Sequence, residues 1–268
     1  MYRTIRTLRI VIALIALAVP TWALTAGYES VFVRMQIFTA LLSGAAVCLI
    51  FWALVALIYG RIYCSTVCPL GTVMDGVAFL GRRVRRRAGG YRYVPPSDRT
   101  RIVFVIIAFA LMLTGSAAIP ALIDPYTAYA RMVGQFVLVP LHLGIGAVFS
   151  MSALGLASLT AMVIVAVAWK RGRRLCNTVC PVGSLLGAAS RHSILHFDIN
   201  TDLCINCGEC ERVCKSECIN LLDHTVDSSR CVVCFNCTAV CPNDAITYRS
   251  GRHTPATPLF QPEKRAAE

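Results

Sequence analysis

Four long, largely uncharged stretches of apolar residues dominate the first two thirds of the chain. They cover about residues 8–26, 37–59, 102–123 and 141–169. Each has about the 20 residues that a helix needs to cross a hydrocarbon core of roughly 30 Å, so the pattern predicts four transmembrane helices. The first stretch follows three arginines, as in a signal peptide, but no small-residue cleavage site follows it, and we expect it to be retained.

After the second stretch, apolar residues recur at helical spacing from Val73 to Val84. This periodicity predicts an amphipathic helix that lies along the membrane interface. Five arginines follow within residues 82–87. Next to a membrane span, such a run is typical of orientation and of attraction to anionic lipid, so we expect membrane lipid as the partner and no nucleic acid.

The position of the charges predicts which side each loop occupies. The chain carries 26 Lys and Arg against 14 Asp and Glu, a net charge of +12. The basic residues gather before the first span, between residues 60 and 101, and after the fourth span, whereas the other two loops hold only Arg34 and Arg131. The positive-inside rule then places both termini and the 60–101 loop in the cytoplasm of a bacterium. We expect a multi-pass inner-membrane protein with only short loops, at residues 27–36 and 124–140, on the opposite face.

A segment with two cysteines occurs twice in the chain. Residues 60–72 (GRIYCSTVCPLGT) recur as residues 172–184 (GRRLCNTVCPVGS), a constant offset of 112. Each copy follows an even-numbered span. The chain is therefore expected to contain two duplicated two-span units with the same orientation.

The paired cysteines of this duplication form a candidate metal or redox site. Cys64, Cys68, Cys176 and Cys180 would place four thiols on the cytoplasmic side, with each pair on one helix face if the helix continues to the proline. We expect the proline to end that helix and the following glycine to let the chain turn. Four thiolates suit a third iron–sulfur cluster or a soft metal such as Cu(I), and a thiol–disulfide relay would use the same residues.

Eight further cysteines lie in two runs after the fourth span. The chain has 14 cysteines in all, but it is too long and too apolar for a secreted disulfide scaffold. Both runs follow the Cys-x2-Cys-x2-Cys-x3-Cys spacing of bacterial [4Fe–4S] proteins, in which the fourth cysteine binds the other cluster. The first cluster would be held by Cys204, Cys207, Cys210 and Cys241, and the second by Cys231, Cys234, Cys237 and Cys214.

The first run departs from this pattern in one place. Lys215 stands where the pattern has proline, and Cys218 follows soon after. Cys218 is either a spare thiol or an alternative ligand, and we favour the spare thiol. Alternating residues at 194–199, 219–222 and 245–248 predict the short strands of a ferredoxin-like domain. We expect this domain to cover residues 191–249, after a membrane domain of residues 1–190, and the proline-containing tail of residues 250–268 to be disordered.

The two Cys-x3-Cys-Pro motifs at residues 64–69 and 176–181, with the two cluster motifs, resemble those of NapH/MauN-type ferredoxin-type membrane proteins. The chain also looks like the membrane and iron–sulfur part of NosR-type and CcoG-type proteins. The resemblance implies an all-α bundle of four membrane helices joined to a small α+β domain with two [4Fe–4S] clusters. It also implies electron transfer between membrane quinol, iron–sulfur centres and a reductase or its maturation system.

Three functions compete on these observations. The first is a quinol-linked electron-transfer subunit, such as part of a quinol dehydrogenase, with quinone and another redox protein as partners. The second is a copper-reducing or assembly factor for a respiratory enzyme. The third is a membrane-anchored ferredoxin without a quinone site.

Overall fold

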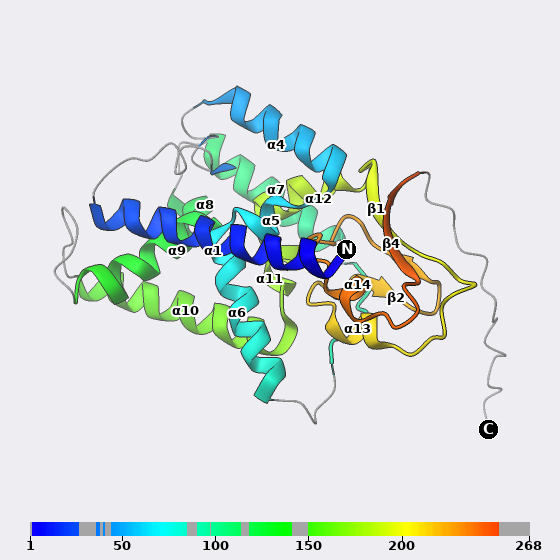
Figure 1. Cartoon of the computed structure of the whole chain (residues 1–268). Helices are drawn as coiled ribbons and strands as arrows, with labels where there is room; N and C mark the ends of the chain where they lie inside the picture. Colours follow the sequence, from blue (N-terminus) through cyan, green and yellow to red (C-terminus); the bar gives the residue numbers. More distant parts are fainter. Residues whose placement is uncertain are drawn as a thin grey trace, which may run out of the picture.

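The fold consists of a helical part and, at one end of it, a smaller part built from short strands and helices (Figure 1). The structure is a computed structural model, and it describes residues 2–26, 36–37, 40, 44–84, 90–96, 98–113, 118–140 and 150–251. The predicted disordered tail lies outside the described residues, apart from Ser250 and Gly251. So do parts of the second, third and fourth predicted spans.

The helical part begins with α1 and ends with α12. Its elements are α1 (Tyr2–Ala26), α4 (Ala46–Tyr59), α5 (Tyr63–Thr66), α6 (Pro69–Val84), α7 (Asp98–Leu113), α8 (Ala118–Ile123), α9 (Pro125–Val133), the π-helical segment η1 (Gly134–Leu138), α10 (Met151–Arg171), α11 (Arg174–Thr178) and α12 (Pro181–Ser190). Two of the described helices, α1 with 25 residues and α10 with 21, are long and apolar enough to cross a membrane. These two agree with the first and fourth predicted spans, and a bundle of four spans stays a prediction.

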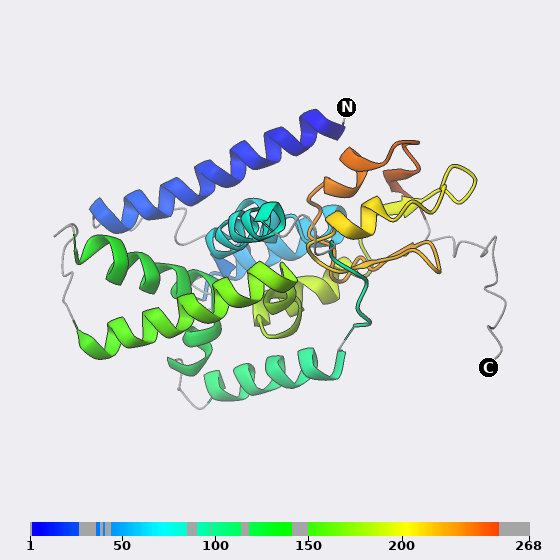
Figure 2. The same cartoon turned by 90° about the horizontal axis from the view of Figure 1, so that it is seen from below.

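The predicted amphipathic helix is present as α6, and it lies in the middle of the helical part. It runs across α1 and α10 in Figure 1 and is seen nearly end-on between them in Figure 2. Its buried side contacts α1, α9 and α10 and contains Met74, which is fully buried. A Cβ atom at Gly81 would lie 2.9 Å from the Trp169 carbonyl oxygen of α10. Glycine therefore allows these two helices to approach closely.

The prediction of a short loop at residues 124–140 was wrong, because this segment forms α9 and η1. Asp124 precedes α9, and its carboxylate accepts hydrogen bonds from the Thr127 backbone N–H (2.8 Å) and hydroxyl (2.9 Å). Pro125 is the first helical residue. An aspartate cap followed by proline is a standard helix start, and the apolar face of α9 then packs onto α6 and α10.

The smaller part contains the predicted strands. Its elements are β1 (Leu195–Ile199), α13 (Glu209–Val213), β2 (Ile219–Asn220), β3 (Thr225–Val226), α14 (Asn236–Val240) and β4 (Ile246–Ser250). β1 pairs antiparallel with β4, with Phe197 opposite Tyr248, and β2 pairs with β3. The strand β3 was not predicted. The two sheets and two helices enclose a core that includes Phe197, Phe235 and Ile246.

This small part, residues 191–251, is called the cysteine module below, and it rests on the ends of several helices. The ring of Tyr2, at the start of α1, stacks on Phe235 with ring centroids 6.1 Å apart. The Tyr248 hydroxyl donates to the carbonyl oxygen of Tyr59, the last residue of α4 (2.9 Å). The N-terminal end of α1 and the C-terminal end of α4 therefore lie at the same end of the molecule (Figure 1).

Candidate iron–sulfur site

Each copy of the duplicated segment forms a short helical turn followed by a longer helix. The first cysteine of each pair lies on the turn, α5 or α11, and the second lies just before α6 or α12. Pro69 and Pro181 are the first residues of α6 and α12, a position that needs no backbone N–H. Our prediction that the proline ends a helix was wrong, because in both copies it begins one.

The second cysteine of each pair accepts a hydrogen bond from the start of the following helix. The Gly183 N–H donates to Cys180 Sγ (3.3 Å), and the Gly71 backbone N–H bonds the Cys68 thiol in the same way. A helix N-terminus favours a thiolate, whereas burial raises the pKa of both thiols. Buried sulfurs of this kind stay deprotonated when they bind a metal.

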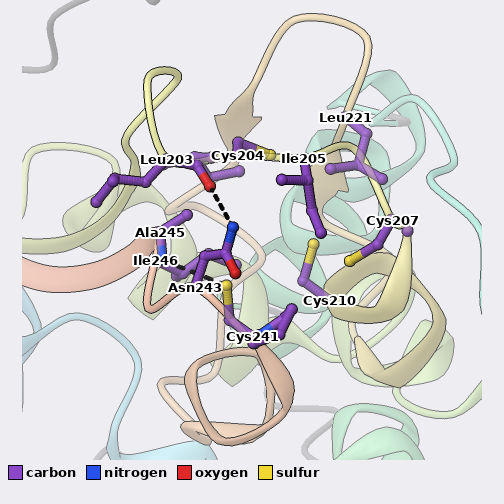
Figure 3. Close-up of a pocket in the computed structure, with 13 residues that line it drawn as sticks. Leu203, Cys204, Ile205, Cys207, Cys210, Leu221, Cys241, Asn243, Ala245 and Ile246 are labelled. Carbon is purple, nitrogen blue, oxygen red and sulfur yellow. Dashed lines mark hydrogen bonds between the residues drawn. The ribbon is translucent and has the colours of Figure 1, made fainter.

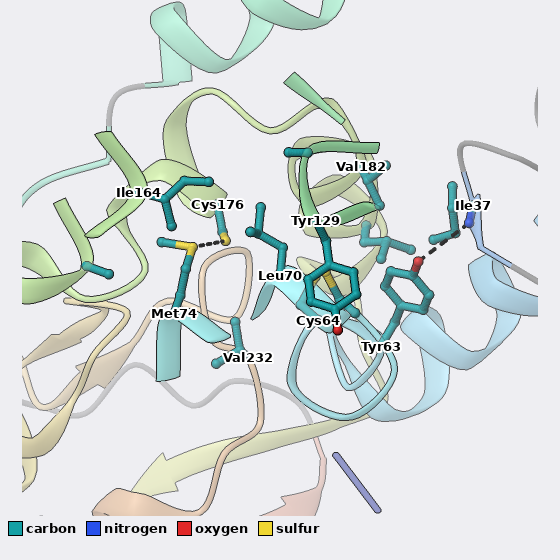
Figure 4. Packing of buried hydrophobic residues seen from close by; sticks show 14 of the residues in the cluster. Ile37, Tyr63, Cys64, Leu70, Met74, Tyr129, Ile164, Cys176, Val182 and Val232 are labelled. Carbon is teal, nitrogen blue, oxygen red and sulfur yellow. Dashed lines mark hydrogen bonds between the residues drawn. The ribbon is translucent and has the colours of Figure 1, made fainter. Parts of the chain in front are cut away.

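The two cysteine pairs meet in one buried cluster, part of which is drawn in Figure 4. Cys64, Cys68 and Cys176 are at most 8% exposed, and Cys180 packs against the same cluster. Burial raises the pKa of Cys68, and the neighbouring thiols of Cys64 and Cys176 raise it further. The other three thiols act on the pKa of Cys180 in the same direction. The fold therefore brings together four cysteines from the two copies.

Two arginines hold the copies together by crossing from one to the other. Arg61 of the first copy donates from Nη2 to the carbonyl oxygen of Cys176 in the second copy (3.3 Å). Arg173, its counterpart at the offset of 112, donates from Nη1 to the carbonyl oxygen of Cys64. Both side chains are completely buried. The reciprocal contact is what a two-fold relation between the copies requires.

The glycine that recurs after the proline in both copies has a role that we did not predict. Gly71 and Gly183 lie inside α6 and α12, so they do not turn the chain. A Cβ atom at Gly183 would lie 2.2 Å from the Cys176 carbonyl oxygen and 2.8 Å from Arg61 Nη2. At Gly71 it would lie 2.5 Å from the Cys64 carbonyl oxygen of the same copy and 2.7 Å from Arg173 Nη1 of the other copy. Each glycine leaves the space that the crossing guanidinium occupies.

Asp75 of α6 faces three buried cations. Its carboxylate accepts a hydrogen bond from Arg173 Nε (2.7 Å), is paired with Lys215, and lies 3.6 Å from Arg9 Nη1. Burial alone would raise the pKa of Asp75, but the charges of Arg173 and Lys215 hold it well below its usual range. Three cations thus share one carboxylate beside the cysteine cluster.

The four cysteines predicted to hold the first cluster line one pocket of the cysteine module (Figure 3). Cys204, Cys207, Cys210 and Cys241 surround it, with apolar residues such as Ile199 and Ile246 completing the wall. Burial raises the pKa of Cys210 to about 12, and the thiols of the other three cysteines add to the shift. The predicted ligand set is therefore assembled around one cavity.

The four cysteines predicted to hold the second cluster also lie together. Burial raises the pKa of Cys237, and the thiols of Cys234, Cys231 and Cys214 raise it further. Cys214 comes from the first run and the other three from the second, as the bacterial pattern requires.

Cys218 lies among the cysteines predicted to hold the second cluster. Its Sγ is 3.4 Å from Cys214 Sγ, it also hydrogen-bonds the Cys231 thiol, and it is 1% exposed. This thiol is therefore in direct contact with two predicted ligands, and the predicted spare role does not account for that position.

These donor sets fit iron–sulfur clusters. Each set provides four thiols in a buried or apolar setting, and a cubane takes one thiolate on each of its four irons. Among the described residues, no three His, Cys, Asp or Glu side chains are arranged to hold a single metal ion. Cubane ligands need not converge on one point, so this observation is compatible with cluster binding.

The cysteines predicted to hold the second cluster lie on the side of the module that faces the duplicated segment. Arg173 N–H donates to the Lys215 carbonyl oxygen (2.8 Å), Asn177 Nδ2 to that of Ser216 (3.1 Å) and Arg61 Nη1 to that of Ser229 (3.1 Å). These residues flank Cys214 and Cys231 in the chain. Cys207 of the first set, in contrast, is exposed. Sequence reasoning missed these contacts, although the arginine repeated in both copies provides two of the three donors.

Comparison with known protein families supports iron–sulfur binding in both parts of the chain. A family described as "4Fe-4S binding domain" matches residues 41–87 and 153–200, which contain the two copies of the duplicated segment. A second family with the same description matches residues 197–220, the first cysteine run of the module. No solved structure matches the chain.

Several curated proteins are similar to the chain. The methylamine utilization ferredoxin-type protein MauN of Paracoccus denitrificans is 30% identical over 188 residues, which cover 69% of this chain and 58% of that protein. The ferredoxin-type protein NapH of Escherichia coli is 27% identical over 66% of this chain and 54% of its own length. The putative electron transport protein YccM of the same species is 25% identical, with 65% and 46% covered. The chain thus spans about half the length of these relatives.

The chain is related to the NapH/MauN-type ferredoxin-type proteins. Its NapH/MauN-type features are the 4Fe-4S domains and the duplicated cysteine segment. The family matches support an iron–sulfur protein. The resemblance to NosR-type and CcoG-type proteins stays a prediction, and the second cysteine run, residues 231–241, rests on its own spacing because it lies outside the matched ranges.

Proposed function

We propose that this protein carries electrons between quinol in the inner membrane and a soluble redox protein, through two [4Fe–4S] clusters in the cysteine module. The observation that carries the proposal is the placement of the second ligand set beside the duplicated segment and of the first set, with exposed Cys207, on an open face. Two clusters in this order would provide a path for electrons from the helical part to the surface.

Within this proposal, Cys204, Cys207, Cys210 and Cys241 hold the first cluster, and Cys231, Cys234, Cys237 and Cys214 hold the second. Each cluster supplies a site that accepts and releases one electron. The protein's own residues bury the ligands, hold the two sets in one small module and attach that module to the helical part.

A third cluster at Cys64, Cys68, Cys176 and Cys180 is part of the proposal. Arg9, Arg61, Arg173 and Lys215 are at most 8% exposed, and Asp75 is the carboxylate that the described residues place against three of them. An uncompensated buried charge is very unfavourable. A cluster with four thiolate ligands would supply negative charge that compensates these buried cations.

Iron and sulfide analysis with EPR spectroscopy tests the cluster assignment. Anaerobically purified protein should contain about twelve iron atoms per chain, because three cubanes hold four each. Replacing all four cysteines of the duplicated segment with serine should reduce the content to about eight. An unchanged content of about eight in both proteins would remove the third cluster, and a content near zero would overturn the proposal.

The quinol link is tested by reduction of the clusters. Purified, cluster-loaded protein in lipid should be reduced by a quinol analogue, measured by EPR, and several quinone types should be compared. The variant without the four cysteines of the duplicated segment separates quinol-linked transfer from a membrane-anchored ferredoxin. A ferredoxin that is only anchored should still transfer electrons in this variant. Failure of every quinol would contradict the link.

The partner would bind at the open face of the first cluster. Leu203 and Ile205 line its pocket and are 49% and 62% exposed, and exposed carboxylates lie near them in the chain at Asp202 and Glu209. An apolar centre with an acidic border fits a basic redox protein. Ile205→Lys should slow the reduction of cytochrome c, a basic acceptor, by several-fold. Ile194→Lys, an equally exposed isoleucine elsewhere on the module, should not.

Copper handling is the second candidate function, and one contact favours it. Cys176 Sγ lies 3.5 Å from the thioether sulfur of Met74 (Figure 4). Thiolate and thioether sulfurs are the ligands that select Cu(I). If this is the function, Met74→Leu should weaken Cu(I) binding, measured by competition with a chromophoric chelator, and deletion of the gene should impair a copper oxidase while anaerobic respiration continues.

A further inference from the structure

The two halves of the cysteine module are internal repeats of the cysteine spacing, and two of the positions at which they differ lie just after the fourth cysteine. Cys204 and Cys231 are 27 positions apart, and the other corresponding cysteines keep this offset. At the same offset, Lys215 corresponds to Pro242 and Cys218 to Ala245. Comparing corresponding positions of the two halves therefore shows which side chains are particular to one of them.

Cys218 adds a sulfur atom to a backbone position that both halves share. In the other half, the Ala245 N–H donates to Cys241 Sγ (3.3 Å), and the Cys218 N–H bonds the Cys214 thiol in the same way. Both residues are 1% exposed. The Cys218 thiol, however, extends to within 3.4 Å of Cys214 Sγ and also reaches the Cys231 thiol. It is placed to donate its S–H to ligand sulfurs.

Lys215 adds a buried positive charge next to Cys214, the ligand that Cys218 also contacts. Its side chain is 7% exposed and is paired with Asp75, a carboxylate that Arg173 already neutralises. The charges of Lys215 and Arg9 both act on the thiol of Cys234, a ligand of the second cluster. Pro242, at the corresponding place in the other half, is exposed and uncharged.

We propose that Lys215 and Cys218 are positioning residues that raise the reduction potential of the second cluster. Reduction adds one negative charge to the cluster, and both a nearby buried cation and an S–H bond to a ligand sulfur favour the more negative form. The proposal rests on the proposed function, because it needs both clusters. Its consequence is that an electron on the module is drawn toward the cluster next to the duplicated segment.

An EPR-monitored redox titration of the full-length protein tests the proposal. Cys218→Ala should reduce the ratio of reduced to oxidised second cluster roughly tenfold at a fixed potential, which is about 59 mV for one electron. Lys215→Met should shift it in the same direction. The potential of the first cluster should stay unchanged in both variants. The signals are assigned with Cys207→Ser, which alters only the first set.

Conservative variants distinguish the proposal from a structural role. Cys218→Ser keeps a donor and Lys215→Arg keeps a charge, so both should stay near the wild-type potential. Ala245→Cys should raise the potential of the first cluster by transferring the same thiol to the other half.

Three results would overturn the inference: an unchanged second potential in Cys218→Ala, equal shifts of both clusters, or no rescue by the conservative variants. Iron and sulfide content is measured in every sample. Absence of two cubanes in the wild type would defeat the proposed function itself, whereas two intact cubanes with unmoved potentials would defeat only this inference.

Discussion

At the scale of single residues, the duplicated segment depends on the absence of two side chains as much as on its cysteines. Gly183 lies against the Cys176 carbonyl oxygen and the Arg61 guanidinium, at 2.2 and 2.8 Å from where a Cβ atom would stand. Gly183→Ala must displace a backbone and a buried charge, so we expect a loss of at least 1–3 kcal/mol of stability, the usual range for overpacking. Gly76→Ala in α6 is the control because nothing lies within 4 Å of its Cβ position, and alanine there should be neutral or stabilising. Thermal unfolding in detergent measures both, and equal behaviour of the two variants would contradict this account of Gly183.

Asp75 provides a second test at this scale. Removing one partner of a buried ion pair typically costs about 3–5 kcal/mol, and Asp75→Asn leaves Arg173 and Lys215 facing a neutral group. The pKa of Asp75 lies below its unfolded value of about 3.9. The carboxylate therefore stabilises the fold fully above that pH, and its contribution is lost as the pH falls toward the folded-state pKa. Denaturant unfolding should show a large deficit of the variant at pH 7 that narrows below about pH 4. Asp223→Asn, at an exposed position, should show no such deficit.

At the scale of elements, α9 shows how a correct pattern can be given the wrong meaning. Asp124 and Pro125 are a standard helix start, yet the segment was predicted as a loop because it joins two apolar stretches. Asp124→Ala should lower the unfolding temperature by the equivalent of about 1 kcal/mol, the usual contribution of such a cap. Asp124→Asn, which keeps an acceptor, should stay close to the wild type. An equal loss in both would mean that the charge and not the cap matters.

What could be predicted from the sequence was what local spacing determines. The span-length helices α1 and α10 follow from the length of the apolar stretches, and the helix α6 and the strands β1, β2 and β4 follow from periodicity. The cysteine spacing predicts which cysteines group into each of the two sets. The crossing of Arg61 and Arg173 depends on how the two copies face each other, and the position of Cys218 depends on the turn at Glu217, which has a φ of 52°. The first depends on residues 112 positions apart, and the second on a left-handed backbone at a glutamate, a residue type that seldom adopts it.

At the scale of the whole molecule, the cysteine module is a common contact for distant parts of the chain. Residues 90–96 run along it, with the Tyr91 N–H donating to the Arg212 carbonyl oxygen (3.1 Å) and the Val94 N–H to that of Glu217 (3.4 Å). Tyr2 at the start of α1 and Tyr59 at the end of α4 also contact the module. All these segments must therefore lie on the same side of a membrane as the module.

This arrangement discriminates between two and four membrane passes. If α1 leads away from the module across the membrane, the chain must return before Tyr59. If α10 also crosses the membrane and ends beside the module at Arg173, the chain must leave once more between Val94 and the start of α10. We therefore expect four passes. Alkaline phosphatase, which needs the oxidising periplasm for its disulfides, should be active when fused after Ala26 and inactive when fused after Tyr93. Green fluorescent protein at the same two sites should give the opposite pattern. Phosphatase activity at both sites would mean that α1 and α10 alone cross the membrane, and the contacts of residues 90–96 with the module could then not form.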